Sequence, residues 1–210
     1  MKKLLLGIAA VCLAGFTFAQ DAPLWMRHSV ISPDGTTIAF TYKGDIYTVP
    51  VAGGRAMQIT TNPAYDTAPV WSPDSKRIAF ASDRMGSLDV YIVAKDGGEP
   101  RRLTTHSGSE TPLAFTDAGH VLFSAGIMPS AEAVVFPSNG QFNQVYRVSV
   151  EGGRPTMISS MPMECISINK EGAMLYQDKK GYEDYWRKHH VSPIARDIWM
   201  YLSLIHISEP

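Results

Sequence analysis

The sequence has little cysteine, no excess of either charge and only one long hydrophobic run. Its 210 residues include 2 cysteines, and 19 Lys and Arg stand against 20 Asp and Glu, for a formal net charge of -1. A nucleic-acid-binding surface needs many basic side chains to displace counterions, so this balance argues against a nucleic-acid partner. Hydrophobic residues make up 45% of the chain, which is enough for a sizeable core and excludes a disordered protein.

The long hydrophobic run lies at the N-terminus and is typical of a secretory signal. Lysines at positions 2 and 3 precede the apolar stretch 4–16, and the small residues Thr17 and Ala19 flank a cleavage site after Ala19. The stretch is shorter than the ~20 residues that a membrane helix needs. We therefore predict a signal peptide over residues 1–19, a periplasmic or secreted bacterial protein, and no membrane span in the mature chain.

Signal cleavage removes Cys12 and leaves Cys165, which then has no partner for a disulfide within the chain. No His or Asn surrounds Cys165 in a recognisable catalytic pattern, so we interpret it as a small apolar residue in a strand. The run LSLIHISEP, residues 202–210, follows abruptly after a strand-like segment and resembles translated adapter or vector sequence. We expect this tail to be foreign to the fold and the chain to be the N-terminal piece of a longer protein.

An internal repeat dominates the rest of the sequence. The segment ISPDGTTIAF (31–40) returns as WSPDSKRIAF (71–80), as AFTDAGHVLF (114–123) and more weakly as SINKEGAMLY (167–176). In such a segment Pro presets φ, the Asp side chain caps nearby backbone N–H groups, and Gly tolerates positive φ. Apolar, β-prone residues follow, so each copy predicts a strand, a turn and a second strand.

A second repeated element follows each copy. It reads DIYTVPVAGGRAMQIT (45–60), DVYIVAKDGGEPRRLT (89–104) and QVYRVSVEGGRPTMIS (144–159), and a fourth begins at Asp197. The glycine pairs favour the left-handed conformations of a tight hairpin between two further strands. We therefore predict an all-β fold: an incomplete β-propeller of about four four-stranded antiparallel blades over residues 24–201, with blades at about 24–64, 65–108, 109–161 and 162–201.

The repeated turn residues are interpreted as structural. A phosphate-binding loop would need a following helix, and a strand-like run follows each glycine pair instead. The fixed place of the aspartates in a turn favours backbone capping over catalysis or calcium binding. The residues assigned to turns are Pro33, Asp34, Gly53, Gly54, Pro73, Asp74, Gly97, Gly98, Asp117, Gly152 and Gly153. We expect no cofactor and no metal.

The units differ in the connection between their second and third strands. It spans 6 residues from Phe40 to Ile46, 10 from Phe80 to Val90, and 22 in each of the last two units. Long loops on a rigid scaffold usually carry binding or docking. The third connection, 126–143, is apolar and rich in Pro, whereas the fourth, 177–197, is charged and aromatic.

The fourth connection supplies the candidate contact residues. They are Tyr182, Tyr185, Trp186, Arg187, His189 and His190. One interpretation is a surface for a peptide or a partner domain, with Arg187 available to a carboxylate. The other is a loop that folds over the blade with Trp186 packed and its charges solvated. A metal site from the two histidines is not expected, because adjacent residues of an extended chain point to opposite faces and no third ligand is evident.

The repeats resemble the TolB-type, WD-like propeller units of secreted bacterial proteins. The stretch GYEDYWRKHH (181–190), followed by RDIW (196–199), is similar to the N-terminal propeller of tricorn-protease-like serine peptidases. The similarity runs from about Leu24 to Tyr201. In that family, propellers precede a PDZ-like domain and a peptidase core that uses Ser and His with a further Ser and Glu. None of the core matches this sequence, so no catalytic residue is assigned.

This resemblance implies a non-catalytic propeller portion of a secreted serine peptidase, which scaffolds or gates peptide access to a peptidase core. The implied partners are peptide substrates or the parent's own peptidase and PDZ-like domains. Two alternatives stay open: a periplasmic TolB-like propeller that acts as a protein-binding module, and the propeller of a prolyl-oligopeptidase-type enzyme, which would carry a GxSxG nucleophile elbow downstream. Because an incomplete propeller leaves strand edges unpaired, we also expect the isolated chain to form oligomers.

Overall fold

The computed structural model describes residues 25–126, 143–161, 163–169, 172–178 and 197–201. All regular secondary structure in this part of the chain is β-strand, arranged in four antiparallel sheets. The sheets form an incomplete β-propeller, which confirms the predicted fold class. No helix in the described residues is long and apolar enough to cross a membrane.

Each sheet is made from consecutive strands and is called a blade here. Blade 1 holds β1 (Arg27–Ile31), β2 (Thr37–Tyr42), β3 (Asp45–Pro50) and β4 (Met57–Gln58). Blade 2 holds β5 (Asp66–Trp71), β6 (Arg77–Ser82), β7 (Asp89–Ala94) and β8 (Arg101–Arg102). Blade 3 holds β9 (Glu110–Asp117), β10 (His120–Ala125), β11 (Gln144–Ser149) and β12 (Thr156–Ser159). Blade 4 holds β13 (Met163–Ile168), β14 (Met174–Asp178) and β15 (Ile198–Tyr201), three strands within the described residues. The predicted foreign tail, 202–210, lies outside them.

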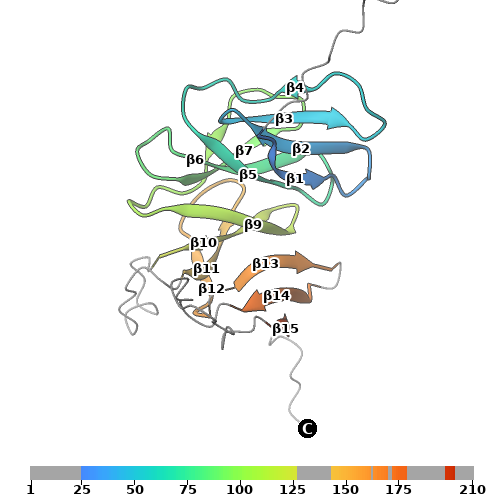
Figure 1. The fold of residues 1–210 in the computed structure, drawn as a ribbon. Helices are drawn as coiled ribbons and strands as arrows, with labels where there is room; N and C mark the ends of the chain where they lie inside the picture. The colour runs from blue at the N-terminus through green and yellow to red at the C-terminus, as the bar shows by residue number, and fades with distance from the viewer. Residues whose placement is uncertain (1–24, 127–142, 162, 170–171, 179–196, 202–210) are drawn as a thin grey trace, which may run out of the picture.

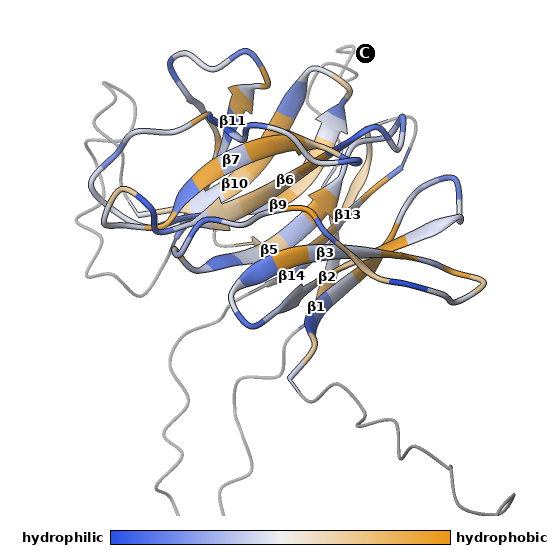
Figure 2. Cartoon of the chain, turned by 90° about the horizontal axis from the view of Figure 1, so that it is seen from above, coloured by the Kyte–Doolittle hydropathy of each residue, from blue (hydrophilic) through white to orange (hydrophobic). Residues whose placement is uncertain are grey.

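The blades follow one another face against face. Figure 1 shows the β9–β12 sheet between the first two blades and the β13–β15 sheet, and the first strands of successive blades lie beside one another. In Figure 2 the hydrophobic colour follows the strands, notably β7 and β10, and the hydrophilic colour gathers in the connections. Successive side chains of a strand point to opposite faces, so a strand between two blades must be apolar on both faces. The run from Val90 to Val93 meets this requirement and is buried throughout.

Three clusters of buried side chains join the blades. In each cluster, the front face of one blade, which is the face toward the next blade, packs against the back face of its successor. Between blades 1 and 2, the front residues Ala39, Ile46 and Ile59 meet the back residues Trp71, Ile78, Phe80, Tyr91 and Val93. Between blades 2 and 3, Ala79, Val90, Ile92 and Leu103 meet Phe115, Val121, Phe123, Tyr146 and Val148. Between blades 3 and 4, Leu122 and Val145 meet Met163, Met174 and Tyr176. Front faces are therefore mostly aliphatic, and back faces carry the aromatic rings.

The first strand of each blade carries an irregularity that the sequence did not reveal. Register shifts interrupt the pairing of β1, β5, β9 and β13 with their neighbours. Within three of these shifts a non-glycine residue has positive φ: His28 (51°), Ala68 (51°) and Cys165 (52°). Such bulges bend a strand and increase its local twist. Cys165 does lie in a strand, but the bulge leaves it exposed.

Candidate functional site at the blade junctions

The candidate contact residues from the sequence lie outside the described part of the chain. They are Tyr182, Tyr185, Trp186, Arg187, His189 and His190, in the connection between β14 and β15. The third-blade connection, of which 127–142 is not described, joins β10 to β11. The peptide-contact role of these residues is taken up below as a proposal. The polar site that the structure does describe lies at the junctions between blades.

The predicted turn aspartates cap the backbone of their own turns. Asp34 Oδ1 accepts hydrogen bonds from Ser32 Oγ at 2.6 Å and from the Thr36 backbone N–H at 3.0 Å. These donors lower the pKa of Asp34 to about 2. Asp74 accepts equivalent bonds from Ser72 and the backbone of residue 76, and its pKa is lowered as well. Asp117 accepts from the Gly119 N–H at 2.6 Å. The carboxylates are therefore engaged in holding their turns.

The predicted turn prolines and glycines also lie in connections between strands. Pro33 and Pro73 are exposed, between the first and second strands of blades 1 and 2. The glycine pairs lie between the third and fourth strands, and all six residues have positive φ, from 83° to 126°. They are Gly53, Gly54, Gly97, Gly98, Gly152 and Gly153. Each of these connections is six residues long, as in 51–56 between β3 and β4, so the hairpins are wider than the tight turn that the glycine pairs suggested.

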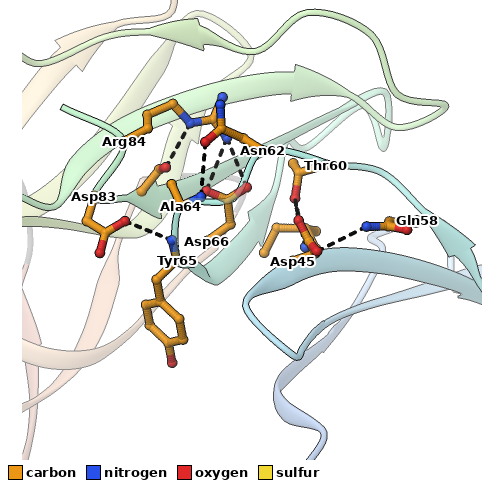
Figure 3. Close-up of polar contacts among 11 residues, drawn as sticks. Asp45, Gln58, Thr60, Asn62, Ala64, Tyr65, Asp66, Asp83 and Arg84 are labelled. Atoms are coloured by element: carbon orange, nitrogen blue, oxygen red, sulfur yellow. Dashed lines mark hydrogen bonds and ion pairs between the residues drawn. The ribbon is translucent and has the colours of Figure 1, made fainter.

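A buried polar cluster joins blade 1 to blade 2. Thr60 Oγ1 accepts a hydrogen bond from the Ile46 N–H at 3.0 Å and donates to Asp45 Oδ1 at 3.3 Å. Gln58 Nε2 donates to Asp45 Oδ2 at 3.0 Å (Figure 3). The chain then enters the next blade at Asp66, whose N–H donates to the Gly44 carbonyl at 2.7 Å. One threonine thus ties the third strand of a blade to the segment that leads to the next blade.

Arg84 completes this first junction from blade 2. Its Nη2 lies 2.9 and 3.1 Å from the two carboxylate oxygens of Asp66, which is fully buried (Figure 3). Its Nε donates to Ser82 Oγ at 2.8 Å. The guanidinium carbon lies 4.7 Å from the ring centre of Tyr91 and 5.6 Å from that of Phe80. A planar guanidinium can stack on rings and pair with a carboxylate at once, so Arg84 neutralises a charge that burial would otherwise make costly.

The junction between blades 2 and 3 repeats this plan with the arginine in another place. Thr104 Oγ1 accepts from the Val90 N–H at 2.9 Å and lies 3.4 Å from Asp89 Oδ1 and 3.2 Å from Glu110 Oε2. Arg102 Nη2 is 2.7 Å from Asp89 Oδ2. Asp89 and Glu110 are both fully buried. Glu110 Oε1 has no hydrogen-bond partner in the described structure, and its nearest basic atom is His106 Nδ1 at 3.6 Å.

In each junction the arginine pairs with one acid, and the pKa of the other acid is raised. In the first junction Arg84 pairs with Asp66, and burial raises the pKa of Asp45. In the second junction Arg102 pairs with Asp89, and burial together with the neighbouring Asp89 charge raises the pKa of Glu110 to about 7. A desolvated carboxyl without its own cation favours the neutral form. Each junction therefore carries two acids and one guanidinium; Asp45 is half-buried, and Asp66, Asp89 and Glu110 are fully buried.

A polar pocket of about 260 Å³ lies beside the first junction. Residues 59–63, Arg84 and residues 98–100 line it. Arg84 lies in the connection between the second and third strands of blade 2. The pocket therefore lies at the end of blade 2 from which that connection leaves. The corresponding connections of blades 3 and 4 contain 126–143 and 179–197.

The described residues show how the blades are joined rather than a set of catalytic groups. The His120 ring contacts Asp117 at 3.0 Å, and His106 Nδ1 accepts a hydrogen bond from the Gly108 N–H at 3.0 Å, so these rings engage an acid and a backbone group. Within the described ranges, no three His, Cys, Asp or Glu side chains are grouped to hold a metal. Sequence reasoning missed the junctions. The sequence feature that could have revealed them is a threonine 15 residues after the Asp of each D-[IV]-Y motif, at Asp45–Thr60 and Asp89–Thr104.

Comparison with known proteins places this architecture in a family. The family model "Tricorn protease N-terminal beta propeller domain" matches residues 23–204. The chain is 25% identical over 180 residues to "Tricorn protease homolog 1" of Streptomyces coelicolor, covering 85% of this chain and 16% of that protein. It is 30% identical over 129 residues to the "Uncharacterized peptidase YuxL" of Bacillus subtilis, covering 60% of this chain and 20% of that protein.

Solved structures agree on the fold. A putative TolB from Agrobacterium tumefaciens superposes with a TM-score of 0.60 at 17% identity, over 75% of this chain and 55% of that one. The chain spans a fifth or less of the length of the two peptidase relatives. The family model, in contrast, covers nearly all of the sequence and every described strand. The chain therefore belongs to the tricorn protease N-terminal β-propeller family.

Proposed function

We propose that this chain is the non-catalytic propeller portion of a periplasmic or secreted tricorn-like serine peptidase, where it scaffolds or gates the access of peptides to a peptidase core. The family match over residues 23–204 carries the proposal. The partners are peptide substrates and the peptidase and PDZ-like domains of the parent. The N-terminal run over residues 1–19, read as a signal peptide, directs the protein out of the cytoplasm.

The stiffness of the described scaffold supports this role. Acids, buried threonines and partly exposed arginines join the first three blades, and apolar clusters fill the space between all four. Such a frame holds attached loops in fixed relative positions. The long connections 126–143 and 177–197 join second to third strands in successive blades, so they leave their blades at corresponding ends. Peptide contact is proposed for the aromatic and charged side chains of the second of these connections.

Peptide binding tests the gating role directly. Binding of fluorescein-labelled unstructured peptides with a free carboxyl terminus would be followed by anisotropy. We expect Arg187→Ala and Trp186→Ala to weaken binding, because the guanidinium pairs with carboxylates and the indole offers apolar area. Arg154→Ala is the matched control, since Arg154 is an exposed arginine in a connection between third and fourth strands. Equal affinities for Arg187→Ala and the control would refute the assignment.

The reading frame that encodes the chain tests the peptidase parentage. Sequencing beyond the region that encodes Tyr201 is expected to reveal further propeller units, then a PDZ-like domain and a Ser and His peptidase core. A frame that stops after the propeller would overturn the parentage and favour a TolB-like binding module. A GxSxG nucleophile elbow in its place would favour a prolyl-oligopeptidase-type enzyme. Either outcome leaves the peptide-binding measurement independently interpretable.

A further inference from the structure

Two arginines of blade 2 reach across the junction to blade 3. Arg101 Nη2 donates to the Val150 carbonyl, and Arg101 Nη1 lies 2.8 Å from Glu151 Oε2. Arg77 Nη2 donates to the Ala118 carbonyl. The acceptors belong to the β9–β10 and β11–β12 connections of blade 3. The arginines therefore hold blade 3 at the end of the blades that carries the repeated turns.

Other residues stand at these positions in the junction between blades 1 and 2. Met57 begins β4, as Arg101 begins β8. Thr37 begins β2, as Arg77 begins β6. The Met57 side chain has no hydrogen-bond donor, and the Thr37 hydroxyl contacts Thr36 Oγ1 at 3.2 Å. Neither side chain can therefore make the contact to the next blade that its counterpart makes.

A pocket of about 160 Å³ lies at this end of the first junction. It is lined by Thr37, Thr48, Val49, Pro50, Arg55 and Met57 of blade 1 and by Lys95 and Asp96 of blade 2. Its volume is several times the ~30 Å³ that one water molecule occupies in the liquid, so a planar guanidinium group fits. The apolar surface of Met57 and Pro50 suits the methylene stem of an arginine.

The acceptors that receive Arg101 in the second junction have counterparts in this pocket. Lys95 is the first residue after β7, as Val150 is the first after β11. Asp96 and Glu151 come next in the two connections. Within the described residues, no donor contacts the Lys95 carbonyl or the Asp96 carboxylate. The pocket thus presents a carbonyl and a neighbouring carboxylate, the pair of acceptors that binds a guanidinium in the next junction.

The charges around the pocket are close to balanced. The Lys95 ammonium is near enough to Asp34 for their charges to attract, which offsets the charge of Lys95. Arg55 is exposed and makes no ion pair with a described residue. Solvent screens the repulsion between Arg55 and a second cation, whereas a cation on Asp96 would be in direct contact with its carboxylate.

We propose that the pocket between blades 1 and 2 binds an arginine side chain of a peptide segment, in the place that Arg101 takes in the next junction. The guanidinium donates to the Lys95 carbonyl and pairs with Asp96. Arginine is favoured over lysine, because its planar fork can donate to both acceptors at once. The pocket lies at the opposite end of the blades from the connections 126–143 and 177–197, so this inference does not depend on the proposed function.

Titration with Nα-acetyl-L-arginine methylamide, followed by the backbone amide NMR signals of the chain, tests the site. We expect saturable shifts confined to residues around the pocket, with a Kd in the millimolar range, because the contacts are few and partly exposed. The uncharged citrulline analogue should bind at least about tenfold more weakly, and Asp96→Asn should weaken arginine binding by about tenfold. Glu99→Gln is the matched control, since Glu99 is an exposed acid of the same connection that does not line this pocket.

Met57→Arg tests whether the position equivalent to Arg101 is the binding position. An arginine of the chain should then fill the pocket and abolish saturable binding, while circular dichroism shows native strands. Arg55→Ser should tighten binding, because it removes the nearest uncompensated cation. Three results would each overturn the proposal: no saturable shifts up to about 50 mM probe, equal affinity for the arginine and citrulline probes, or a folded Met57→Arg chain that binds like the unmodified one. If Met57→Arg does not fold, equal affinities of Asp96→Asn and Glu99→Gln would overturn it instead.

Discussion

Asp89 and Glu110 share one fully buried site between blades 2 and 3, and the guanidinium of Arg102 lies 2.7 Å from Asp89. Thr104 Oγ1 lies between the two acids, 3.4 Å from Asp89 and 3.2 Å from Glu110. With one cation for two carboxyls, the electrostatics favour a proton on Glu110. The junction thus links the stability of the propeller to pH.

The raised pKa of Glu110 predicts that stability falls as the pH rises. Its pKa increases from 4.5 in the unfolded chain to about 7 in the fold, so the folded state binds the proton more tightly. The stabilisation is therefore fully present below pH 4.5 and is lost as the pH rises through about 7, at a cost on the order of 3 kcal/mol. Urea unfolding at a series of pH values would measure this slope.

The variant Glu110→Gln separates this effect from other titrations. The amide keeps the shape of the protonated acid and does not ionise, so this variant should show a smaller loss of stability between pH 5 and pH 8. His106, Asp89 and Arg102, the other charged or titratable groups at the site, remain in both proteins. An unchanged pH dependence in Glu110→Gln would show that Glu110 does not carry the slope.

Removal of the Arg84 side chain should strongly destabilise the first junction. Arg84→Met keeps much of the apolar stem but leaves the fully buried Asp66 without its ion pair. Loss of one partner of a buried pair costs about 3–5 kcal/mol. The double variant Arg84→Met/Asp66→Leu should recover much of this loss, and Arg55→Met, at an exposed arginine in the β3–β4 connection, should have little effect. Chemical denaturation measures all three, and a neutral Arg84→Met would contradict the role of the pair.

Ser75 is expected to help hold blades 1 and 2 in register. It has a φ of 56°, where blade 1 has Gly35 at 72°, and its Oγ accepts a hydrogen bond from the Asp34 N–H at 3.1 Å. Ser75→Ala loses this bond and keeps the strained backbone, so it should cost about 1–2 kcal/mol. Ser75→Gly loses the bond but relieves the strain, so its cost should be smaller. Equal unfolding free energies for Ser75→Ala and Ser75→Gly would argue that relief of backbone strain at position 75 contributes nothing measurable.

Equivalent core positions should differ in cost because their neighbours differ. Ile78 on the back face of blade 2 is fully buried against blade 1, whereas Ile38, its equivalent in blade 1, is half-buried. Ile78→Ala should destabilise by about 2–5 kcal/mol, and Ile38→Ala by clearly less. Equal costs, measured by thermal and urea unfolding of both variants, would show that the back face of blade 1 is covered in solution.

Local chemistry explains why the fold was predictable. The Ser-Pro-Asp turn depends on bonds between neighbours, such as Asp34 with Ser32 and Thr36, and these residues are adjacent in the sequence. Runs of β-prone apolar residues such as 90–93 are likewise visible in the sequence, because a strand buried on both faces needs apolar residues at successive positions. The junctions were harder to find, because Arg84 and Asp66 are 18 residues apart and no motif links them. The candidate contacts at 182–190 remain a prediction.

The sequence by itself determined the repeating unit and the family, because turn chemistry, runs of β-prone residues and motif spacing are local properties of the chain. Only the tertiary structure decided which carboxyl of each junction pairs with the arginine and which has its pKa raised. It also decided that Ile198 is exposed where Val90 and Val145 are buried. The reason is that burial and pKa are set by neighbouring blades, and similar units acquire different surroundings once they are stacked.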